Sequence, residues 1–241
     1  MGVDALDLER TLKLLAIERP VFYSEADFQH ALAWKIHEQY SNSRIRLEVP
    51  SGNFDKRERI DIIAYDNGQK YAIELKYKKK RLTVVVDGET FALSDDGAQD
   101  ISRYDVFKDI VRLERYVAAA DNTTGYAIFL TNDDLYWRES SRGINSAAFF
   151  LHEARRVDAG TAYAWHERTG DGTRKGREQA LTIRTSYTLR WNDYSRVSEQ
   201  PQARFRYLLL HVRKMCLGVG AVLDPPSHRR LTNPLWRSRI V

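Results

Sequence analysis

Residues 59 to 76 read Arg59-Ile-Asp-Ile-Ile-Ala-Tyr-Asp-Asn-Gly-Gln-Lys-Tyr-Ala-Ile-Glu-Leu-Lys76, and this stretch decides the fold. Two runs rich in β-branched and aromatic residues flank Asn67-Gly68, a dipeptide that is the strongest short-range signal for a two-residue β-hairpin turn. The turn fixes the register of the two strands. The sequence therefore predicts a hairpin in which Asp61 lies directly opposite Glu74.

Asp61, Glu74 and Lys76 are expected to lie together on one face of this hairpin. Directly opposed residues share a face, with Cβ atoms about 4.5–5.5 Å apart, and Lys76 follows Glu74 by two positions on that face. Opposed carboxylates repel and destabilise a sheet unless a cation compensates them. Hard oxygen ligands are those that Mg²⁺ prefers, so the pattern predicts a magnesium site. Lys76 is then placed to orient or deprotonate a water and to offset negative charge on a phosphate.

An ordinary half-exposed hairpin is the alternative interpretation. It explains Glu74 and Lys76 as a neighbouring pair of charges on a solvated strand. It does not explain Asp61, because the surrounding residues of both strands are apolar: Ile60, Ile62, Ile63, Ala64, Ala72, Ile73 and Leu75.

Hydrophobic periodicity predicts the elements around the hairpin. Ser24 and Asp27 form a near capping box, with Asp in place of the usual Glu or Gln, which marks the start of a helix. An apolar run without polar alternation indicates a central strand covered on both faces. The resulting order predicts an α/β domain with a mixed central sheet. The predicted helices cover 4–18, 24–40 and 98–119, and the predicted strands cover 44–49, 82–93 (a hairpin turning at Asp87-Gly88) and 126–131.

The chain beyond residue 135 is expected to add β elements to the sheet over about 135–215. A short helix is predicted near 147–157, and residues 169–179 form a basic, glycine-rich loop. The tail 225–241 contains three prolines and several arginines and is expected to be poorly ordered. We expect one domain over 1–241 with a core of about 24–131. The additional strands are predicted near 161–166, 181–191 and 205–212.

Ile60-Asp61, twelve intervening residues and Glu74-Leu75-Lys76 resemble the motif of the PD-(D/E)xK nuclease superfamily. The order helix, three strands, helix, strand over residues 24–131 is similar to the αβββαβ core of that restriction-endonuclease-like fold. The departure is Ile60, which stands where the motif name has proline, and many members tolerate this change.

This resemblance implies roles for particular residues. Asp61 and Glu74 would bind Mg²⁺, with Mn²⁺ as an expected substitute, and Lys76 would assist the attacking water. Some members add a glutamate from the first core helix, which makes Glu25 a further catalytic and metal-binding candidate. The alternative for Glu25 is an acid favoured by the helix dipole in the first turn.

Basic residues near the motif are candidate contacts to nucleic acid. For the run that follows Lys76, phosphate contact and an ordinary solvated strand end both remain open. The helix over 98–119 carries Gln99, Arg103, Lys108 and Arg112, and for Gln99 and Arg103 an ordinary place on the protein surface is the favoured interpretation. The candidate contacts are Lys78, Lys79, Lys80, Arg81, Arg103, Arg174 and Lys175.

Composition excludes several classes of protein. A formal charge of +5 and a pI of about 9.2 permit a nucleic-acid partner without demonstrating one. No apolar stretch reaches the roughly 18 residues of a membrane span, and no secretory signal is visible, so we expect a cytoplasmic protein without a membrane partner. Cys216 is the one cysteine, which excludes an internal disulfide and a cysteine-based zinc site. No HExxH motif or phosphate-binding loop is present, so neither a zinc protease nor nucleotide hydrolysis is supported.

The sequence thus predicts a metal-dependent nuclease that hydrolyses phosphodiester bonds, with DNA expected rather than RNA. The alternative is a catalytically silent module with the same fold that binds nucleic acid or serves as a scaffold in a larger complex. The acidic pair and Lys76 argue against this alternative, because a binding module gains nothing from carboxylates aimed at phosphates. Cutting both strands of a duplex would favour a homodimer.

Overall fold

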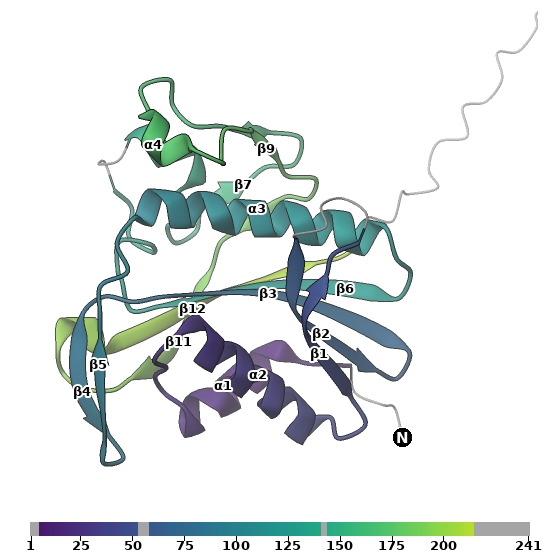
Figure 1. Cartoon of the computed structure of the whole chain (residues 1–241), viewed down its shortest axis with the longest axis vertical. Coiled ribbons are helices and arrows are strands. Elements are labelled where there is room, and N and C mark those ends of the chain that lie inside the picture. The colour runs from purple at the N-terminus through teal and green to yellow at the C-terminus, as the bar shows by residue number, and fades with distance from the viewer. Residues whose placement is uncertain (1–4, 53–57, 141–143, 215–241) are drawn as a thin grey trace, which may run out of the picture.

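A six-stranded sheet runs through the computed structural model, which describes residues 5–52, 58–140 and 144–214 (Figure 1). The strand order is β1-β2-β3-β6-β12-β11; β3 and β6 are parallel, and every other neighbouring pair is antiparallel. The predicted α/β class with a mixed sheet is therefore confirmed. The strands are β1 (Arg44–Pro50), β2 (Arg59–Asp66), β3 (Gln69–Lys78), β6 (Thr123–Thr131), β11 (Trp191–Arg196) and β12 (Arg204–Val212).

Helices cover both faces of this sheet (Figure 1). Helices α1 (Leu8–Glu18) and α2 (Glu25–Gln39) pack on one face, and α3 (Gln99–Ala118) packs on the other. The helices predicted over 24–40 and 98–119 are confirmed. The first helix starts later than predicted, because the side chain of Asp7 accepts a hydrogen bond from the Arg10 amide and so caps it.

The cap of α2 places Glu25 in the first turn of that helix. Ser24 Oγ accepts a hydrogen bond of 3.1 Å from the Asp27 amide, as a capping box requires. The return bond is shifted by one residue, since the Asp27 carboxylate accepts from the Tyr23 amide at 3.0 Å. The predicted cap is thus present in a modified form, and it fixes the entry of the chain into α2.

Parallel pairing of β3 with β6 requires a long crossover, and α3 supplies it. The crossover also contains the predicted second hairpin, formed by β4 (Leu82–Val86) and β5 (Glu89–Leu93). The close approach of α3 to the sheet depends on Gly125 of β6. A Cβ atom there would lie 3.0 Å from Val117 Cγ2 and 3.1 Å from Val212 Cβ, so a larger residue would push the helix outward.

The central hairpin has the predicted register over most of its length. Pairing runs from Asp66 with Gln69 to Ile62 with Ile73 and then stops. The expected direct pairing of Asp61 with Glu74 is therefore not part of the ladder. The two strands separate at this point, and the separation shapes the candidate site.

The chain after residue 135 departs most from the sequence-based expectations. The strand near 205–212 is confirmed as β12, but the helix near 147–157 is wrong: a 3₁₀ helix, η1 (Ile144–Phe149), is followed by β7 (Arg156–Val157). The guanidinium of Arg155 accounts for the early end of this helix. It donates to the carbonyl oxygens of Ala148, at 2.6 Å, and of Phe150, and it thereby satisfies the last carbonyl groups of the turn.

The strands expected near 161–166 and 181–191 are shorter than predicted. Glu114 of α3 explains the break in the second, because its carboxylate accepts from the amides of Arg184 and Thr185 at 2.8 and 2.9 Å and draws the chain to the helix. Two small paired ribbons and one turn of helix result, and they lie on the outer side of α3 (Figure 1). These elements are β8 (Ala162–Tyr163), β9 (Leu181–Thr182), β10 (Tyr187–Thr188) and α4 (Asp171–Arg174).

Only β11 and β12 extend the main sheet within the part of the chain that the structure describes. The predicted poorly ordered tail 225–241 and Cys216 lie outside the described residues. Across the described ranges, every helix is too short or too polar to cross a membrane.

Candidate active site

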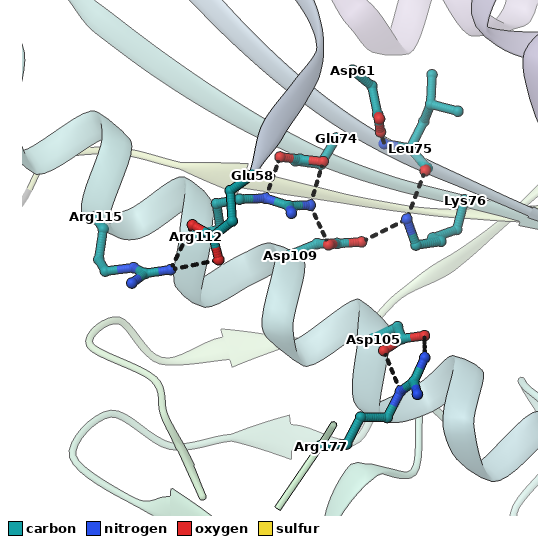
Figure 2. Close-up of polar contacts among 10 residues, drawn as sticks. All are labelled: Glu58, Asp61, Glu74, Leu75, Lys76, Asp105, Asp109, Arg112, Arg115 and Arg177. Atoms are coloured by element: carbon teal, nitrogen blue, oxygen red, sulfur yellow. Dashed lines mark hydrogen bonds and ion pairs between the residues drawn. The ribbon is translucent and has the colours of Figure 1, made fainter. Parts of the chain in front are cut away.

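Charged side chains from β2, β3 and α3 gather where β2 separates from β3 (Figure 2), and Glu25 of α2 joins them. Most members of this cluster lie between the sheet and α3, where they are sheltered from solvent, and Glu25 reaches the cluster from α2 on the other face. Four members are acidic and two are basic. The acidic cluster consists of Glu25, Asp61, Glu74, Lys76, Asp109 and Arg112.

Glu74 is the most deeply buried member, with 1% of its surface exposed. Arg112 Nε lies 2.6 Å from Glu74 Oε1, and Arg112 Nη2 lies 2.7 Å from Glu74 Oε2. The same Nη2 donates to Asp109, one turn earlier on α3. A bidentate guanidinium–carboxylate pair is short, directional and strong, and burial makes the loss of either partner costly. Glu74 is thus tied to α3 as well as to its own strand.

Lys76 is held by the same acidic surroundings. Its Nζ lies 3.0 Å from Asp109 Oδ2 and 3.4 Å from the Leu75 carbonyl oxygen. Burial lowers the pKa of Lys76, but attraction to Asp109, Glu25 and Asp61 outweighs burial and raises the pKa above its ordinary value. A lysine held as an ammonium donates hydrogen bonds and carries positive charge. The geometry therefore favours the orienting role of Lys76 over the deprotonating one.

Asp61 lies at a break in the pairing of β2 with its two neighbouring strands. Pairing with β1 omits this position, because Leu47 pairs with Ile62 and Val49 pairs with Ile60 while Glu48 and Asp61 stay unpaired. Glu48 adopts a left-handed φ of 52°, an unfavourable backbone conformation for glutamate. Such outliers persist where the surroundings impose them and are frequent at functional sites.

Gln29 of α2 stabilises this break. Its Nε2 donates to the Asp61 carbonyl oxygen at 2.8 Å and to Glu48 Oε1 at 2.9 Å, which replaces the missing ladder bonds. The alternation of β2 is disturbed as a result, since Ile60 and Ile63 both pack on the α3 side of the sheet. Asp61 Oδ2 then accepts a 2.7 Å hydrogen bond from the Leu75 amide (Figure 2). The Asp61 carboxylate therefore fills the space between β2 and β3.

Glu25 reaches the cluster from the first turn of α2. Its Oε2 accepts a 2.9 Å hydrogen bond from the Tyr77 amide, one residue beyond Lys76. Its charge raises the pKa values of both Asp61 and Lys76. The structure thus brings together all four catalytic residues predicted from the sequence.

The carboxylates of the cluster oppose one another's ionisation. Burial raises the pKa of Asp61 to about 6; Lys76 and the Leu75 amide lower it, while Asp109 and Glu25 raise it further. Burial and the charges of Asp109 and Asp61 raise the pKa of Glu74 well above its ordinary value, against the effect of Arg112. Four carboxylates against two cations leave an excess of two negative charges when all are ionised.

A divalent cation fits this excess charge and the hard oxygen donors of the cluster. Asp61 and Glu74 are the residues that would hold it, with Glu25 at the edge of the cluster. In this structure Arg112 donates hydrogen bonds to both carboxylate oxygens of Glu74. Within the described ranges, no three His, Cys, Asp or Glu side chains are arranged to hold a metal ion.

The predicted basic contacts are scattered. Lys78 follows Lys76 on the same face of β3 and is half-buried, and Arg81 is exposed. Lys79 pairs with Asp96 at 3.1 Å, and Lys80 pairs with Asp95 at 3.2 Å. These side chains therefore lie at and just beyond the end of β3, two to five residues after Lys76.

The structure places the remaining candidates away from the acidic cluster. Arg103 is 8% exposed, and its guanidinium donates to the Leu135 carbonyl oxygen at 2.6 Å and packs against the rings of Tyr136 and Phe150. Arg174 pairs with Asp171 on α4, next to the exposed Lys175, on the outer side of α3 (Figure 1). Gln99 donates to Asp133 at 2.9 Å.

Sequence reasoning missed Asp109 and did not distinguish Arg112 from the other polar residues of its helix. Both residues lie beside the apolar stripe of α3 that contains Val106, Ile110 and Leu113. A charged residue next to such a stripe, three positions from a charge of opposite sign, was the available signal. Gln29, which fixes the break in β2, carried no signal of its own.

No family model matches the chain, and no curated protein matches it either. The function is therefore proposed from the chemistry of the acidic cluster.

The raised pKa of Asp61 makes stability depend on pH. The folded-state pKa is about 6 and the ordinary value is 3.8, so the folded protein binds this proton more tightly than the unfolded chain. The resulting destabilisation is absent below about pH 4 and grows until about pH 6. Asp61→Asn keeps an acceptor for the Leu75 amide and removes the charge. We expect this variant to gain about 1–2 kcal/mol relative to wild type at pH 8, and nothing at pH 4.

Urea unfolding in EDTA at both pH values measures this difference. A gain of the same size at pH 4 and pH 8 would contradict the assigned cause, since a neutral Asp61 cannot be destabilising by its charge.

Proposed function

We propose that the chain is a metal-dependent nuclease of the PD-(D/E)xK type that hydrolyses phosphodiester bonds. The observation that carries this proposal is the convergence of Asp61, Glu74 and Lys76 at the point where β2 leaves its ladder with β3 and skips one pair of its ladder with β1. An excess of buried negative charge at this point is costly without a cation. A structural hairpin has no need of it.

The arrangement of elements supports a restriction-endonuclease-like core. Helix α2, strands β1, β2 and β3, helix α3 and strand β6 follow one another in the order αβββαβ. The β4–β5 hairpin is an addition between β3 and α3. In this core the proposed catalytic residues come from neighbouring strands and the flanking helices, which hold them rigidly.

Each residue of the cluster has a distinct part in the proposed reaction. A bound Mg²⁺ or Mn²⁺ would polarise the phosphate and lower the pKa of a bound water. Asp61 and Glu74 would hold this ion, and Glu25 would add negative charge at its edge. The Lys76 ammonium would orient the water and offset the charge that develops on the phosphate. Asp109 fixes Lys76, and Gln29 fixes the strand at Asp61.

A basic edge beside the cluster supports nucleic acid as the substrate. Ile45 and Leu47 of β1 pack against the α1–α2 side of the sheet, so Arg44 and Arg46 project from the α3 side, the side of Glu74 and Lys76. Both arginines are exposed, and neither pairs with a carboxylate in the part of the chain that the structure describes. The two positions lead along β1 toward the break at Glu48 and Asp61. The phosphates of a DNA strand that lies along β1 would contact these two guanidinium groups.

A catalytically silent nucleic-acid-binding or scaffold module is the second candidate. The pair between Glu74 and Arg112 favours it, because a residue of the chain itself neutralises the most buried carboxylate. Such a module would bind DNA without any dependence on metal. A place in a larger complex suits this second candidate, whereas a nuclease that cuts both strands of a duplex would favour a homodimer.

Cleavage of plasmid, linear duplex, single-stranded DNA and RNA with Mg²⁺, Mn²⁺ or EDTA tests the proposed function. We expect cleavage of DNA that requires the metal ion. Lys76→Ala and Asp61→Ala are each expected to lower kcat by at least about 100-fold, because each removes a group that acts on the reacting phosphate or its metal. Lys70→Ala, which removes a cation from the same face at the start of β3, where it lies over the Tyr116 ring, is the matched control and retains kcat.

Full cleavage by Lys76→Ala would rule out the assigned site. Salt-sensitive binding of DNA that is independent of metal, without cleavage of any of the four substrates, would favour the silent module.

Replacement of both basic-edge residues, Arg44→Ala with Arg46→Ala, tests the approach along β1. We expect KM for DNA to rise and the salt dependence of binding to weaken by about one unit of slope per arginine, with kcat unchanged. Arg196→Ala lies on β11, at the opposite edge of the sheet, and serves as the control. Equal effects of the two edges would show that the basic edge has no special part in binding.

A further inference from the structure

We propose that Arg112 is a resident counter-ion of the active site, which a divalent cation displaces from Glu74 and which then binds the phosphate of the substrate. This inference rests on the proposed function and adds a further catalytic residue to it. It explains why a site suited to a metal is neutralised by a side chain of the chain itself.

Arg112 occupies the whole carboxylate of Glu74. Both of its oxygens are engaged by Arg112, at 2.6 and 2.7 Å, and 1% of Glu74 is exposed. A metal ion needs at least one of these oxygens, and two cations at the same carboxylate repel each other. Metal binding at Glu74 and the bidentate pair with Arg112 therefore exclude each other.

Without a metal ion, Glu74 depends on Arg112 for the neutralisation of its charge. An ionised Glu74 without a partner in this buried place would be strongly destabilising. Burial lowers the pKa of Arg112, but Asp109 and Glu74 raise it above its ordinary value, so the guanidinium is a permanent cation. Arg112 thus keeps the site folded and charged until a metal ion arrives.

Asp109 would hold the guanidinium of Arg112 after a metal ion has displaced it from Glu74. Asp109, three residues earlier on α3, bonds Arg112 Nη2 and keeps the side chain inside the cluster. Asp109 also pairs with Lys76 at 3.0 Å, so it neutralises Arg112 only in part. A guanidinium that loses Glu74 gains free donors in a sheltered place, and its planar fork matches two oxygens of a phosphate. Metal binding would in this way prepare an anion site beside Lys76.

Arg115 provides a matched control on the same helix. It lies one turn beyond Arg112, carries the same charge and pairs with Glu58 at 3.4 Å (Figure 2). It makes no bond to Glu74 or Asp109 among the described contacts. Loss of charge at Arg115 therefore reproduces the general electrostatic effect without the specific competition.

The test measures Mn²⁺ binding by calorimetry or by electron paramagnetic resonance, which needs no activity. We expect Arg112→Gln to bind Mn²⁺ at least about fivefold more tightly than wild type, because a competing cation is gone. Arg115→Gln is expected to stay within about twofold of wild type. Binding by Arg112→Gln that is equal to or weaker than that of wild type would overturn the inference.

Asp61→Ala separates this inference from the proposed function. Loss of Mn²⁺ binding in Asp61→Ala supports the metal site itself. If wild type binds no Mn²⁺, or Asp61→Ala binds it as wild type does, the proposed function fails. If binding depends on Asp61 but does not tighten in Arg112→Gln, only the role of Arg112 fails.

Two further measurements guard against a variant that fails to fold. In wild-type protein labelled with ¹⁵N, the Arg112 Nε–H resonance is expected to shift when Mg²⁺ is added, as its bond to Glu74 breaks. An unchanged resonance at saturating metal would overturn the inference without any variant. With metal bound, Arg112→Gln is expected to lower kcat for DNA despite its tighter metal binding, and Arg112→Lys, which keeps the charge, is expected to recover part of it. Cleavage by Arg112→Gln at the wild-type kcat would show that the guanidinium does not act on the phosphate.

Discussion

The buried pair between Glu74 and Arg112 joins the sheet to α3, and the rest of the site depends on it. It neutralises the least exposed carboxylate, and through Asp109 it extends to Lys76. Removal of either partner would leave an uncompensated charge in the interior. The close approach of α3 at Gly125 is what brings the two elements within reach of each other. The packing of α3 on the sheet therefore places Arg112 beside the carboxylate that it neutralises.

The break in the pairing of β2 is the second constraint. Regular strand pairing is lost at Asp61, and the Asp61 carboxylate lies in the cluster as a result. Asp61 gives up its backbone pairing on both sides, and Gln29 and the Leu75 amide replace the lost bonds. The strained conformation of Glu48 opposite this position is a cost that a purely structural hairpin would avoid. Local strain, raised pKa values and excess negative charge all occur at the same few residues. Their coincidence is what a functional site explains and a solvated strand does not.

Local rules recovered the parts of the structure that short-range chemistry decides. The Asn67-Gly68 turn sets the hairpin register as far as Ile62 and Ile73, and the apolar stripes place α2 and α3 correctly. Those rules failed where distant residues intervene. Gln29 opens the ladder at Asp61, and Glu114 divides the strand expected over 181–191. Periodicity carries no information on such contacts, because they depend on which elements pack together.

The same distinction applies to the site. Asp61, Glu74, Lys76 and Glu25 were predicted from the motif, the register and the resemblance, whereas Asp109 and Arg112 required the packing of α3 on β3. Anomalous scattering from crystals grown with MnCl₂ tests the central claim most directly. The expected result is a manganese peak beside the carboxylates of Asp61 and Glu74, with Arg112 turned away from Glu74. An intact pair between Glu74 and Arg112, without manganese in the cluster, would contradict the assignment of a metal-dependent nuclease.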